Sequence, residues 1–362
     1  MNNLDAKIPK GPLAEKWSNY KNHQKLVNPA NKRRLDIIVV GTGLAGASAA
    51  ASLGEMGFNV LNFCIQDSPR RAHSIAAQGG INAAKNYPND GDSVYRLFYD
   101  TIKGGDNMSK LPLVENMVYS SPVYFNLLLD NGLKIRDVLA RPGGHYGYRT
   151  YVTENQVGSD ITNLQLEMLK NTKANIQLET KMVEIYRTRD DQNKVVGIRV
   201  ATADGYKTIQ ATKGVILATG GFGANAEMRE TQVPYLTAEI PTTNIKAAST
   251  GEGIYLAQAI GANTTQMSNI QRYPFANPED GVLDGYAVWP FTGPSFGIVY
   301  VDYQGNRYVN EGERRDVCAN AAVNSGFIST YSVFTRDIIS FAKDEELELG
   351  LSTGRVLKGD TI

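Results

Sequence analysis

Three glycines near the start of the chain have the spacing of a phosphate-binding turn. Gly41, Gly43 and Gly46 in GTGLAG follow the β-branched run LDIIVV and precede an alanine-rich stretch. In a strand–turn–helix unit the first glycine permits a tight turn, the second lets a pyrophosphate approach the backbone, and the third lets the helix pack on the strand. The phosphates then lie at the helix N-terminus, where unpaired N–H groups point outward. The spacing predicts a dinucleotide site; the alternative is a turn whose glycines serve packing alone.

The elements around this turn predict a βαβ unit. Residues 35–67 pass from the first apolar run through the alanine-rich stretch to Gly57 and a second apolar run, which is typical of two parallel strands joined by a helix. An acidic residue about twenty positions beyond the turn usually holds a ribose hydroxyl. The second run ends in NFCIQDS, which offers Gln66 and Asp67 as candidates for that contact.

Two later glycine-containing segments have the composition of cofactor contacts. The run GVIL ends in ATGG at 218–221, and small residues at a strand end let a cofactor approach the backbone, although such turns are common without one. In STGEG, Glu252 lies at the start of a predicted helix. There it either caps the helix or accepts hydrogen bonds from a cofactor sugar.

The segments between these motifs predict the scaffold that positions them. Residues 113–142 predict helices broken at Pro122 and at Asn131–Gly132, and residues 158–171 predict an amphipathic helix. Short alternating runs from 175 onward predict a β-meander that leads back to a buried strand at GVILATGG.

The chain divides by composition into three parts. The last part is rich in aromatic residues, proline and glycine. We expect an α/β protein made of an N-terminal arm (1–34), a Rossmann-like cofactor-binding domain with a parallel sheet and a β-meander (35–272), and a partial α+β capping domain (273–362).

Charge and cysteine content favour small-molecule chemistry. The 362 residues carry 37 basic and 37 acidic side chains, and no block of one sign suggests a surface for nucleic acid or acidic lipid. Cys64 and Cys318 lack the spacing of a disulfide framework or a metal site, so we expect neither. The polar N-terminus lacks the apolar core of a signal peptide, and no apolar run is long enough for a membrane span, which predicts a cytoplasmic protein.

The segment RAHSIAAQGGI (71–81) places His73, one of three histidines, before a run of small residues. With the motifs above, the chain resembles the flavoproteins of the succinate dehydrogenase and fumarate reductase superfamily. Residues 1–106, with VVGTGLAGASAAASLGEMGFNV, RRAHSIAAQGGINAA and GDSVYRLFYDTIKGGD, resemble the flavoprotein subunit of respiratory succinate dehydrogenases. Residues 107–362, with GGHYGYRT, ATGGFGAN, STGEG, QRYPFANP and NRYVNEGERRDVCA, resemble soluble flavocytochrome-type fumarate reductases and urocanate reductases.

The resemblance implies FAD as the cofactor. A histidine at the place of His73 carries FAD covalently in succinate dehydrogenases, which raises the reduction potential of the flavin, whereas the soluble reductases usually hold FAD without this bond. A packed or surface histidine is the alternative. The AAQGG run would present small side chains and amides to the flavin. The residues expected at the cofactor are Gly41, Gly43, Leu44, Ala45, Gly46, Gln66, His73, Ser74, Ala77, Gln78, Gly79, Gly80, Val183, Ala218, Thr219, Gly220, Gly221, Asn244 and Glu252.

The resemblance also assigns residues to the substrate. In the family an arginine of the NE…RD segment protonates the substrate carbon, and Arg315 is the matching residue. Arginine is a very weak acid because its free pKa is high, so this role needs a fixed proton relay and a closed, dry site. The alternative is that Arg314 and Arg315 only form salt bridges. Gln271 and Tyr273 stand in the QxHPT segment that binds a substrate carboxylate, with tyrosine in place of histidine, as in urocanate reductases. Because a phenol brings no positive charge, this replacement weakens a preference for dicarboxylates.

The carboxylate that relays protons to this arginine in the family has no counterpart here. Phe291 and Thr292 stand where it is expected. Asp284 is the nearest preceding acidic residue, and Glu279 and Asp280 are weaker candidates.

The expected function is FAD-dependent interconversion of fumarate and succinate, with hydride transfer at flavin N5. A urocanate or other 2-enoate reductase is the first alternative. A flavin-binding chain without turnover is the second, because the chain stops at GRVLKGDTI, before the returning segment that completes the site in the family. In the succinate direction the expected partners are an iron–sulfur subunit and a membrane anchor, with the chain peripheral on the inner face of the cell membrane.

Overall fold

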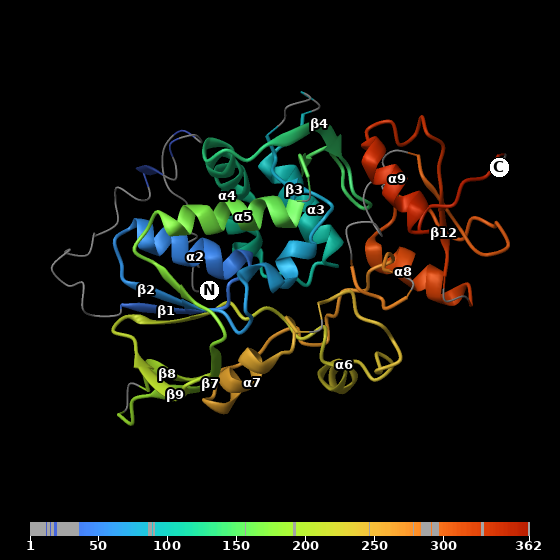
Figure 1. Cartoon of the computed structure of the whole chain (residues 1–362). Coiled ribbons are helices and arrows are strands. Elements are labelled where there is room, and N and C mark those ends of the chain that lie inside the picture. Colours follow the sequence, from blue (N-terminus) through green and yellow to red (C-terminus); the bar gives the residue numbers. More distant parts are fainter. Residues whose placement is uncertain are drawn as a thin grey trace.

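The computed structural model describes residues 36–85, 89, 91–155, 157–190, 193–245, 247–277, 279–283, 291, 297–326 and 329–360, together with positions 12, 15, 18 and 19. The N-terminal arm predicted over 1–34 therefore lies almost wholly outside the described residues. In Figure 1 a sheet that contains β1 (Ile37–Val40) and β2 (Val60–Phe63) lies between a layer of helices and a separate set of strands.

The βαβ unit forms as the sequence predicts. β1 pairs in parallel with β2, with Ile37 opposite Val60, and α2 (Leu44–Glu55) connects them. β1 is buried along its whole length, as expected for a parallel strand covered on both faces. β10 (Gly214–Leu217) and β6 (Asn175–Gln177) extend the sheet in the order β10-β1-β2-β6, with all neighbours parallel. The α/β fold class is confirmed.

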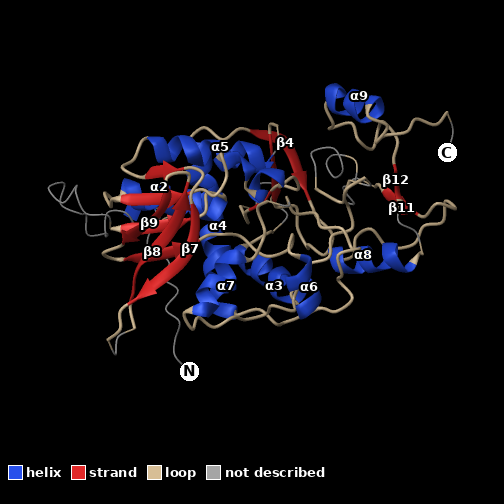
Figure 2. Cartoon of the chain, turned by 60° about the horizontal axis from the view of Figure 1, so that its bottom comes forward, coloured by secondary structure: helices blue, strands red, loops and turns tan. Residues whose placement is uncertain are grey.

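Helices cover one face of this sheet and the β-meander covers the other. α2 and α5 (Val157–Lys170) contribute alanine and other apolar side chains to the core on the first face. β7 (Lys181–Arg187), β8 (Val195–Thr202) and β9 (Gly205–Gln210) form the predicted antiparallel meander, which Figure 2 shows side by side. Apolar side chains of the meander pack against those of β1 and β2.

β10 differs from the buried strand that the sequence predicts. Ile216 and Leu217 are 37% and 40% exposed. The strand lies at the edge of the sheet, beside β1. The prediction of burial is wrong here because an apolar run does not reveal whether its strand lies inside a sheet or at its edge.

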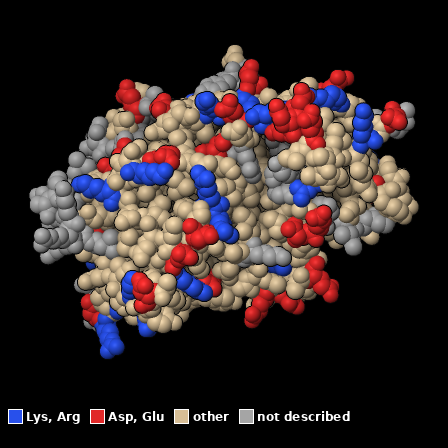
Figure 3. Space-filling view, viewed as in Figure 1, with Lys and Arg blue, Asp and Glu red and all other residues tan. Residues whose placement is uncertain are grey.

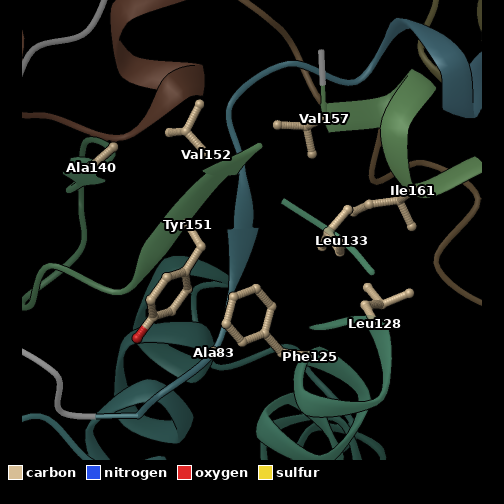
Figure 4. Close-up of a cluster of buried hydrophobic side chains, with 9 residues drawn as sticks. All are labelled: Ala83, Phe125, Leu128, Leu133, Ala140, Tyr151, Val152, Val157 and Ile161. Carbon is tan, nitrogen blue, oxygen red and sulfur yellow. The ribbon is translucent and has the colours of Figure 1, made fainter. Parts of the chain in front are cut away.

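A second core lies around the sheet of order β3-β5-β4. β4 (Ile135–Ala140) and β3 (Ile81–Asn82) both pair antiparallel with β5 (Thr150–Thr153). Figure 4 shows apolar side chains from these strands, from α5 and from α4 (Leu111–Asp130) packed together. The ring centroids of Phe125 on α4 and Tyr151 on β5 lie 4.4 Å apart.

α4 runs without interruption through Pro122, so the helix break predicted at this residue is wrong. A proline inside a helix leaves the carbonyl four residues earlier without its backbone donor. Here that carbonyl belongs to Val118, and it accepts a hydrogen bond from the Ser121 hydroxyl at 3.0 Å. The end predicted at Asn131–Gly132 is confirmed, because Asn131 is the C-cap residue of α4.

The change of resemblance near residue 106 falls between two helices that pack together. α3 (Val94–Gly104) and α4 share a small apolar core on either side of this change. Arg149 is fully buried and forms ion pairs with Asp92 and Asp100, each with an N–O distance of 2.6 Å. These contacts join residues before and after the change into one folded unit.

The C-terminal elements form a further core. β11 (Val299–Val301) and β12 (Tyr331–Val333) pair antiparallel, and side chains of α8 (Arg315–Asn324) and α9 (Asp344–Ser352) pack with them. Cys318 of α8 is buried in this core, and burial together with nearby carboxylates raises the pKa of its thiol to about 11. The elements are of the expected α+β type, whereas the domain boundary near 272 stays a prediction.

Two ion pairs connect these C-terminal elements to the rest of the chain. Arg136 on β4 binds Glu346 on α9, with 2.7 Å between Nη2 and Oε1. Arg136 also donates to the backbone carbonyl of Thr153. Arg314, just before α8, binds Asp106 in the loop between α3 and α4. Both pairs bridge segments that are about 200 residues apart in the sequence.

Two short helices lie between β10 and the C-terminal core, α6 (Ala226–Gln232) and α7 (Glu252–Ala259). Over the described ranges, no helix is both long and apolar enough to cross a lipid bilayer. Figure 3 shows acidic and basic side chains interspersed over one face of the molecule, in line with the zero net charge.

The core around β5 gives a first testable prediction. Phe125→Ala removes a ring that is 0% exposed, and we expect it to lower the free energy of unfolding by about 3–5 kcal/mol through lost burial and a cavity. Tyr95→Ala, at a side chain that is 74% exposed, is the control and should change stability by about 0.5 kcal/mol or less. Urea denaturation followed by circular dichroism measures both; equal effects would contradict the packing described.

Candidate active site

The glycine motif is the most tightly packed part of the candidate site. Gly41 has φ = 110°, a region that favours glycine, and a Cβ there would lie 2.1 Å from the carbonyl oxygen of Ala218. A Cβ on Gly46 would lie 1.9 Å from the carbonyl oxygen of Gly41. β1, β10 and α2 therefore meet at a distance that only glycine permits at these two positions. Gly43 is the N-cap of α2, so the amides of residues 45 and 46 have no carbonyl partner within the helix.

The predicted ATGG segment lies beside this turn, at the end of β10. The Ala218 amide donates to the carbonyl of Val40 at 2.8 Å, which continues the pairing of β10 with β1. A Cβ on Gly253 of α7 would lie 2.1 Å from the hydroxyl of Thr219, so α7 packs closely on this segment. Gly220 has φ = 75°, and around Gly221 no described atom lies within 4 Å of the position of a Cβ. The Cα of Gly221 therefore faces open space at the same sheet edge as the glycine motif, while its carbonyl accepts from the Gly251 amide at 3.1 Å.

His73 begins a short 3₁₀-helix, η4 (His73–Ala76), that is fixed to α2 and α5. The Ser74 hydroxyl accepts a hydrogen bond from the amide of Leu44, the first residue of α2, at 3.1 Å. A Cβ on Gly158 of α5 would lie 2.2 Å from the Ser74 carbonyl oxygen, so α5 also packs on η4. Nδ1 of His73 accepts a hydrogen bond from the Ile245 amide at 3.3 Å. Burial lowers the pKa of His73, so the imidazole is neutral at pH 7.

The small-residue run after His73 is part buried and part open. Gly80 has φ = 117° and packs against Thr150 of β5, where a Cβ would lie 2.4 Å from the Thr150 methyl group. Gln78 is buried, whereas Ala77 and Gly79 are exposed. No described atom lies within 4 Å of a Cβ position on Gly79. Gly79 thus offers a second open stretch of backbone, on the segment that carries His73.

Other predicted cofactor residues are engaged within the chain. Gln66 donates to the Ala247 carbonyl at 2.6 Å, and Glu252 forms a partly exposed ion pair with Lys181, with 2.8 Å between Nζ and Oε1. Asn244 donates to the Thr242 hydroxyl at 3.2 Å, and Val183 lies half-buried on β7. Their roles toward a cofactor stay predictions.

The predicted substrate residues Arg315 and Tyr273 lie together. The guanidinium carbon of Arg315, the first residue of α8, is 5.2 Å from the ring centroid of Tyr273. Burial raises the pKa of Tyr273, which keeps its hydroxyl protonated and able to donate. Gln271 is exposed and donates to the carbonyl of Arg272 at 2.9 Å. Arg314 differs from its neighbour, because it is bound to Asp106 and Asp316.

Among the described residues, the structure shows neither closed surroundings nor a proton relay for Arg315. The Arg315 side chain is exposed, because it lies in the first turn of a surface helix. Asp280 and Glu279 take part in a turn, in which the Asp280 carboxylate accepts from the Val282 amide at 2.9 Å. Asp284 and Thr292 lie outside the described residues, and Phe291 is buried in the C-terminal core.

One residue at this site was not singled out from the sequence. His145 lies in the loop between β4 and β5, and Gly143 and Gly144 of this loop pack against Glu313 and Arg314, directly before Arg315. In the sequence, the segment GGHYGYRT carries only a resemblance to the soluble reductases. The position of His145 near the site depends on how the loop folds against the chain just before α8. There the Gly144 amide donates to the Gly312 carbonyl at 2.9 Å.

A surface hollow of about 430 Å³ lies elsewhere, between α6, α7 and residues 264–268. Uncharged side chains line it, among them Met228, Tyr255 and Gln258. None of the predicted cofactor or substrate residues is among its lining residues, so we do not place the site there. Within the described part of the chain, no cluster of three or more His, Cys, Asp or Glu side chains could hold a metal ion.

Comparison with known proteins identifies the family. The FAD binding domain family matches residues 36–332, so the chain belongs to this family. It is 31% identical to the urocanate reductase of Eggerthella lenta over 96% of this chain and 59% of that protein. It is 30% identical to the NADH:fumarate oxidoreductase of Klebsiella pneumoniae over 90% of this chain and 35% of that protein. The resemblance to fumarate and urocanate reductases noted from the motifs is confirmed.

Solved structures agree with this assignment. The open conformation of a flavocytochrome c3 fumarate reductase matches with a TM-score of 0.68 and 26% identity, over 100% of this chain and 63% of that one. A quinol-fumarate reductase with menaquinol molecules matches with a TM-score of 0.72 at 21% identity, over 89% of this chain and 58% of that one, which shows the shared fold. The chain thus spans about a third to two thirds of the length of these relatives.

FAD is the cofactor of this family, and the residues present fit it. The turn at Gly41–Gly46 brings free helix amides to the edge of a parallel sheet, where a pyrophosphate binds. The open backbone at Gly79 and at Gly221 lies on the two segments that flank this turn, so the chain leaves room for an extended ligand there.

The packing at Gly46 gives a testable prediction for cofactor binding. Gly46→Ala places a methyl group 1.9 Å from the Gly41 carbonyl, which must move and take the turn with it. Overpacking typically costs about 1–3 kcal/mol, so FAD affinity should fall by roughly 5- to 150-fold, measured as flavin fluorescence quenching on titration of FAD into apoprotein. The control is Gly104→Ala at the end of α3, where no described atom lies within 4 Å of the new methyl group. FAD affinity that is unchanged in Gly46→Ala would contradict this role of the turn.

Proposed function

We propose that the chain is the flavin-binding part of an oxidoreductase that reduces the double bond of an α,β-unsaturated carboxylate, with fumarate as the expected substrate. The observation that carries this proposal is the pairing of Arg315 with Tyr273 at the beginning of α8. A cationic donor and a protonated phenol side by side can bind an acceptor-only group such as a carboxylate. The relatives named as fumarate, urocanate and acrylate reductases support the same class of substrate.

The chain's own residues divide the reaction between two segments. FAD, when bound and reduced, supplies a hydride to one carbon of the double bond. Arg315 holds the proton for the other carbon on its guanidinium group, and Tyr273 orients the carboxylate with its hydroxyl. The two electrons come from an external donor. Because Arg315 is exposed in this structure, the acid role requires that further groups cover it during reaction.

A urocanate reductase is the second candidate function, and Tyr273 is the observation that favours it. The phenol provides a hydrogen bond without a charge, which suits a substrate that has one carboxylate and a neutral ring better than a dicarboxylate. The 31% identity to a urocanate reductase supports this alternative.

A covalent bond between His73 and FAD forms part of the proposal. The Ile245 amide donates a hydrogen bond to Nδ1 of His73. This leaves Nε2 of His73 as the nitrogen that can carry a carbon substituent. An imidazole substituted at Nε2 stays neutral and keeps the Nδ1 lone pair, so the bond to Ile245 is compatible with the linked state. The C–N bond replaces one flavin methyl C–H and one imidazole N–H, and the two electrons released pass to an oxidant such as oxygen.

Electron donors and location follow from the direction of the reaction. For succinate oxidation we propose an iron–sulfur subunit as the acceptor and a peripheral position at the cytoplasmic face of a membrane. A quinol-fumarate reductase of the same fold supports an electron-transfer assembly of this kind.

Loss of the proton donor tests the proposed reaction. Arg315→Gln should slow enoate-dependent reoxidation of the chemically reduced protein by about 10²- to 10⁴-fold, because a positioned acid contributes that much. Arg314→Gln, at a residue bound to two carboxylates, is the matched control and should have a much smaller effect. Fumarate, urocanate and acrylate are compared by stopped-flow absorbance. Reduction of urocanate but not fumarate would replace the main proposal with the alternative, and no reoxidation by any enoate would refute both.

The covalent bond is tested by the mass of the acid-denatured protein. We expect an adduct of FAD less two hydrogens on the wild-type chain and its loss in His73→Ala, since this change removes the imidazole that would form the bond. His23→Ala in the N-terminal arm is the control and should keep the adduct. Free FAD released by acid from the wild type would show that the cofactor is held without this bond.

A further inference from the structure

The loop between β4 and β5 holds a buried polar atom that the surrounding chain leaves unsatisfied. Nδ1 of His145 is buried, and no described residue forms a hydrogen bond with it. The backbone amide of the same residue is satisfied, because it donates to the Pro142 carbonyl at 3.2 Å. Native proteins pair nearly all buried polar side-chain atoms with protein, water or a ligand. Other buried side-chain atoms of the described residues also have no hydrogen-bond partner. The His145 nitrogen points to a bound group because its loop also packs against the chain just before Arg315.

This loop is fixed in place on both sides of His145. On one side the Gly144 amide donates to the Gly312 carbonyl at 2.9 Å, and a Cβ on Gly143 would lie 2.2 Å from the carbonyl oxygen of Glu313. On the other side the Tyr146 amide donates to the Asp100 carboxylate at 2.9 Å. Asp100 is held in turn by buried Arg149. Groups fixed in this way before a ligand arrives bind it at a lower cost in conformational entropy.

Burial lowers the pKa of His145 and favours its neutral imidazole. Burial is the main cause that lowers its pKa, and the charges of Arg149 and Arg315 lower it further, while the carboxylates of Asp100 and Asp92 raise it in part. Both carboxylates are already paired with Arg149. A neutral imidazole has one N–H donor and one acceptor nitrogen, so Nδ1 can carry the proton and donate it.

We propose that His145 is a substrate-binding residue, whose Nδ1–H donates a hydrogen bond to a carboxylate oxygen of the enoate. This inference rests on the proposed function and names a third group of that site. The loop of His145 packs on the chain just before Arg315, where a Cβ on Gly144 would lie 3.4 Å from Cγ of Arg314. Arg315 in turn faces the ring of Tyr273, so a guanidinium, a phenol and an imidazole are carried by three adjoining segments. A carboxylate accepts hydrogen bonds and donates none, which matches this set.

The same set of donors restricts the class of ligand. Arg315 is the one charged member of the three, because Tyr273 keeps its proton and His145 is neutral. One positive charge balances a monoanionic carboxylate, whereas a phosphate ester would bring nearly two negative charges. We therefore expect His145 to contribute to binding of monocarboxylate ends in fumarate, urocanate and acrylate alike.

The test separates binding from folding by a change that keeps the ring shape. His145→Phe removes both nitrogens, and we expect KM for enoates to rise about ten- to a hundredfold, the usual range for a hydrogen bond to a charged group, with kcat changed less than about threefold. The melting temperature of the FAD-bound protein should stay equal or rise, since an unsatisfied buried atom is removed. His145→Gln, which keeps an N–H donor, should recover part of the affinity. Tyr146→Ala, at a neighbouring side chain that is 63% exposed, is the control and should leave KM unchanged.

Calorimetric titration of the oxidised FAD-bound protein with fumarate, urocanate and acrylate distinguishes this inference from the proposed function. If the wild type binds an enoate but does not reduce it, and His145→Phe weakens that binding, the inference stands and the proposed reaction fails. If the wild type reduces an enoate and His145→Phe leaves KM and Kd unchanged, the inference is overturned and the reaction stands. Wild-type protein that neither binds nor reduces any of the three acids refutes both.

Discussion

The structure depends on one close contact, where β1, β10 and α2 meet without room for a side chain. The carbonyl of Ala218 lies against Gly41, and the carbonyl of Gly41 lies against Gly46. This contact brings the ends of two parallel strands and the beginning of a helix to the same point. Ser74 then ties η4 to the first amide of α2. The segment that carries His73 is thus positioned by the same turn that offers amides to a pyrophosphate.

The candidate substrate site is built differently, from segments joined by polar contacts. Arg315 begins α8, His145 lies in the β4–β5 loop, and the chain just before α8 is hydrogen bonded to that loop. Buried Arg149 holds this loop in place through ion pairs with Asp92 and Asp100. Breaking one partner of such a buried set leaves an uncompensated charge, so the loop position is strongly determined. The cofactor site rests on backbone packing, whereas the substrate site rests on ion pairs and loop hydrogen bonds.

Local patterns in the sequence predicted the βαβ unit, the β-meander and α5, because strand and helix periodicity and glycine spacing are short-range signals. They could not predict contacts between distant segments. Glu252 pairs with Lys181 on β7, and Gln66 bonds to Ala247, 181 residues away. Pro122 looked like a helix end, but the Ser121 hydroxyl satisfies the carbonyl that the proline frees. The place of His145 beside Arg315 depends on a loop fold that no short motif encodes.

The two cysteines lie in different parts of this arrangement, and both are buried. Cys64 follows β2 in the parallel sheet, and Cys318 lies in α8 beside the candidate substrate site. A thiol must be exposed and deprotonated to be alkylated, and Cys318, with a pKa of about 11, meets neither condition in the folded chain. Alkylation of each cysteine therefore requires local opening around it. The rates at which an alkylating reagent labels the two native thiols therefore report separately on local opening of the sheet and of the C-terminal elements, without introduced cysteines.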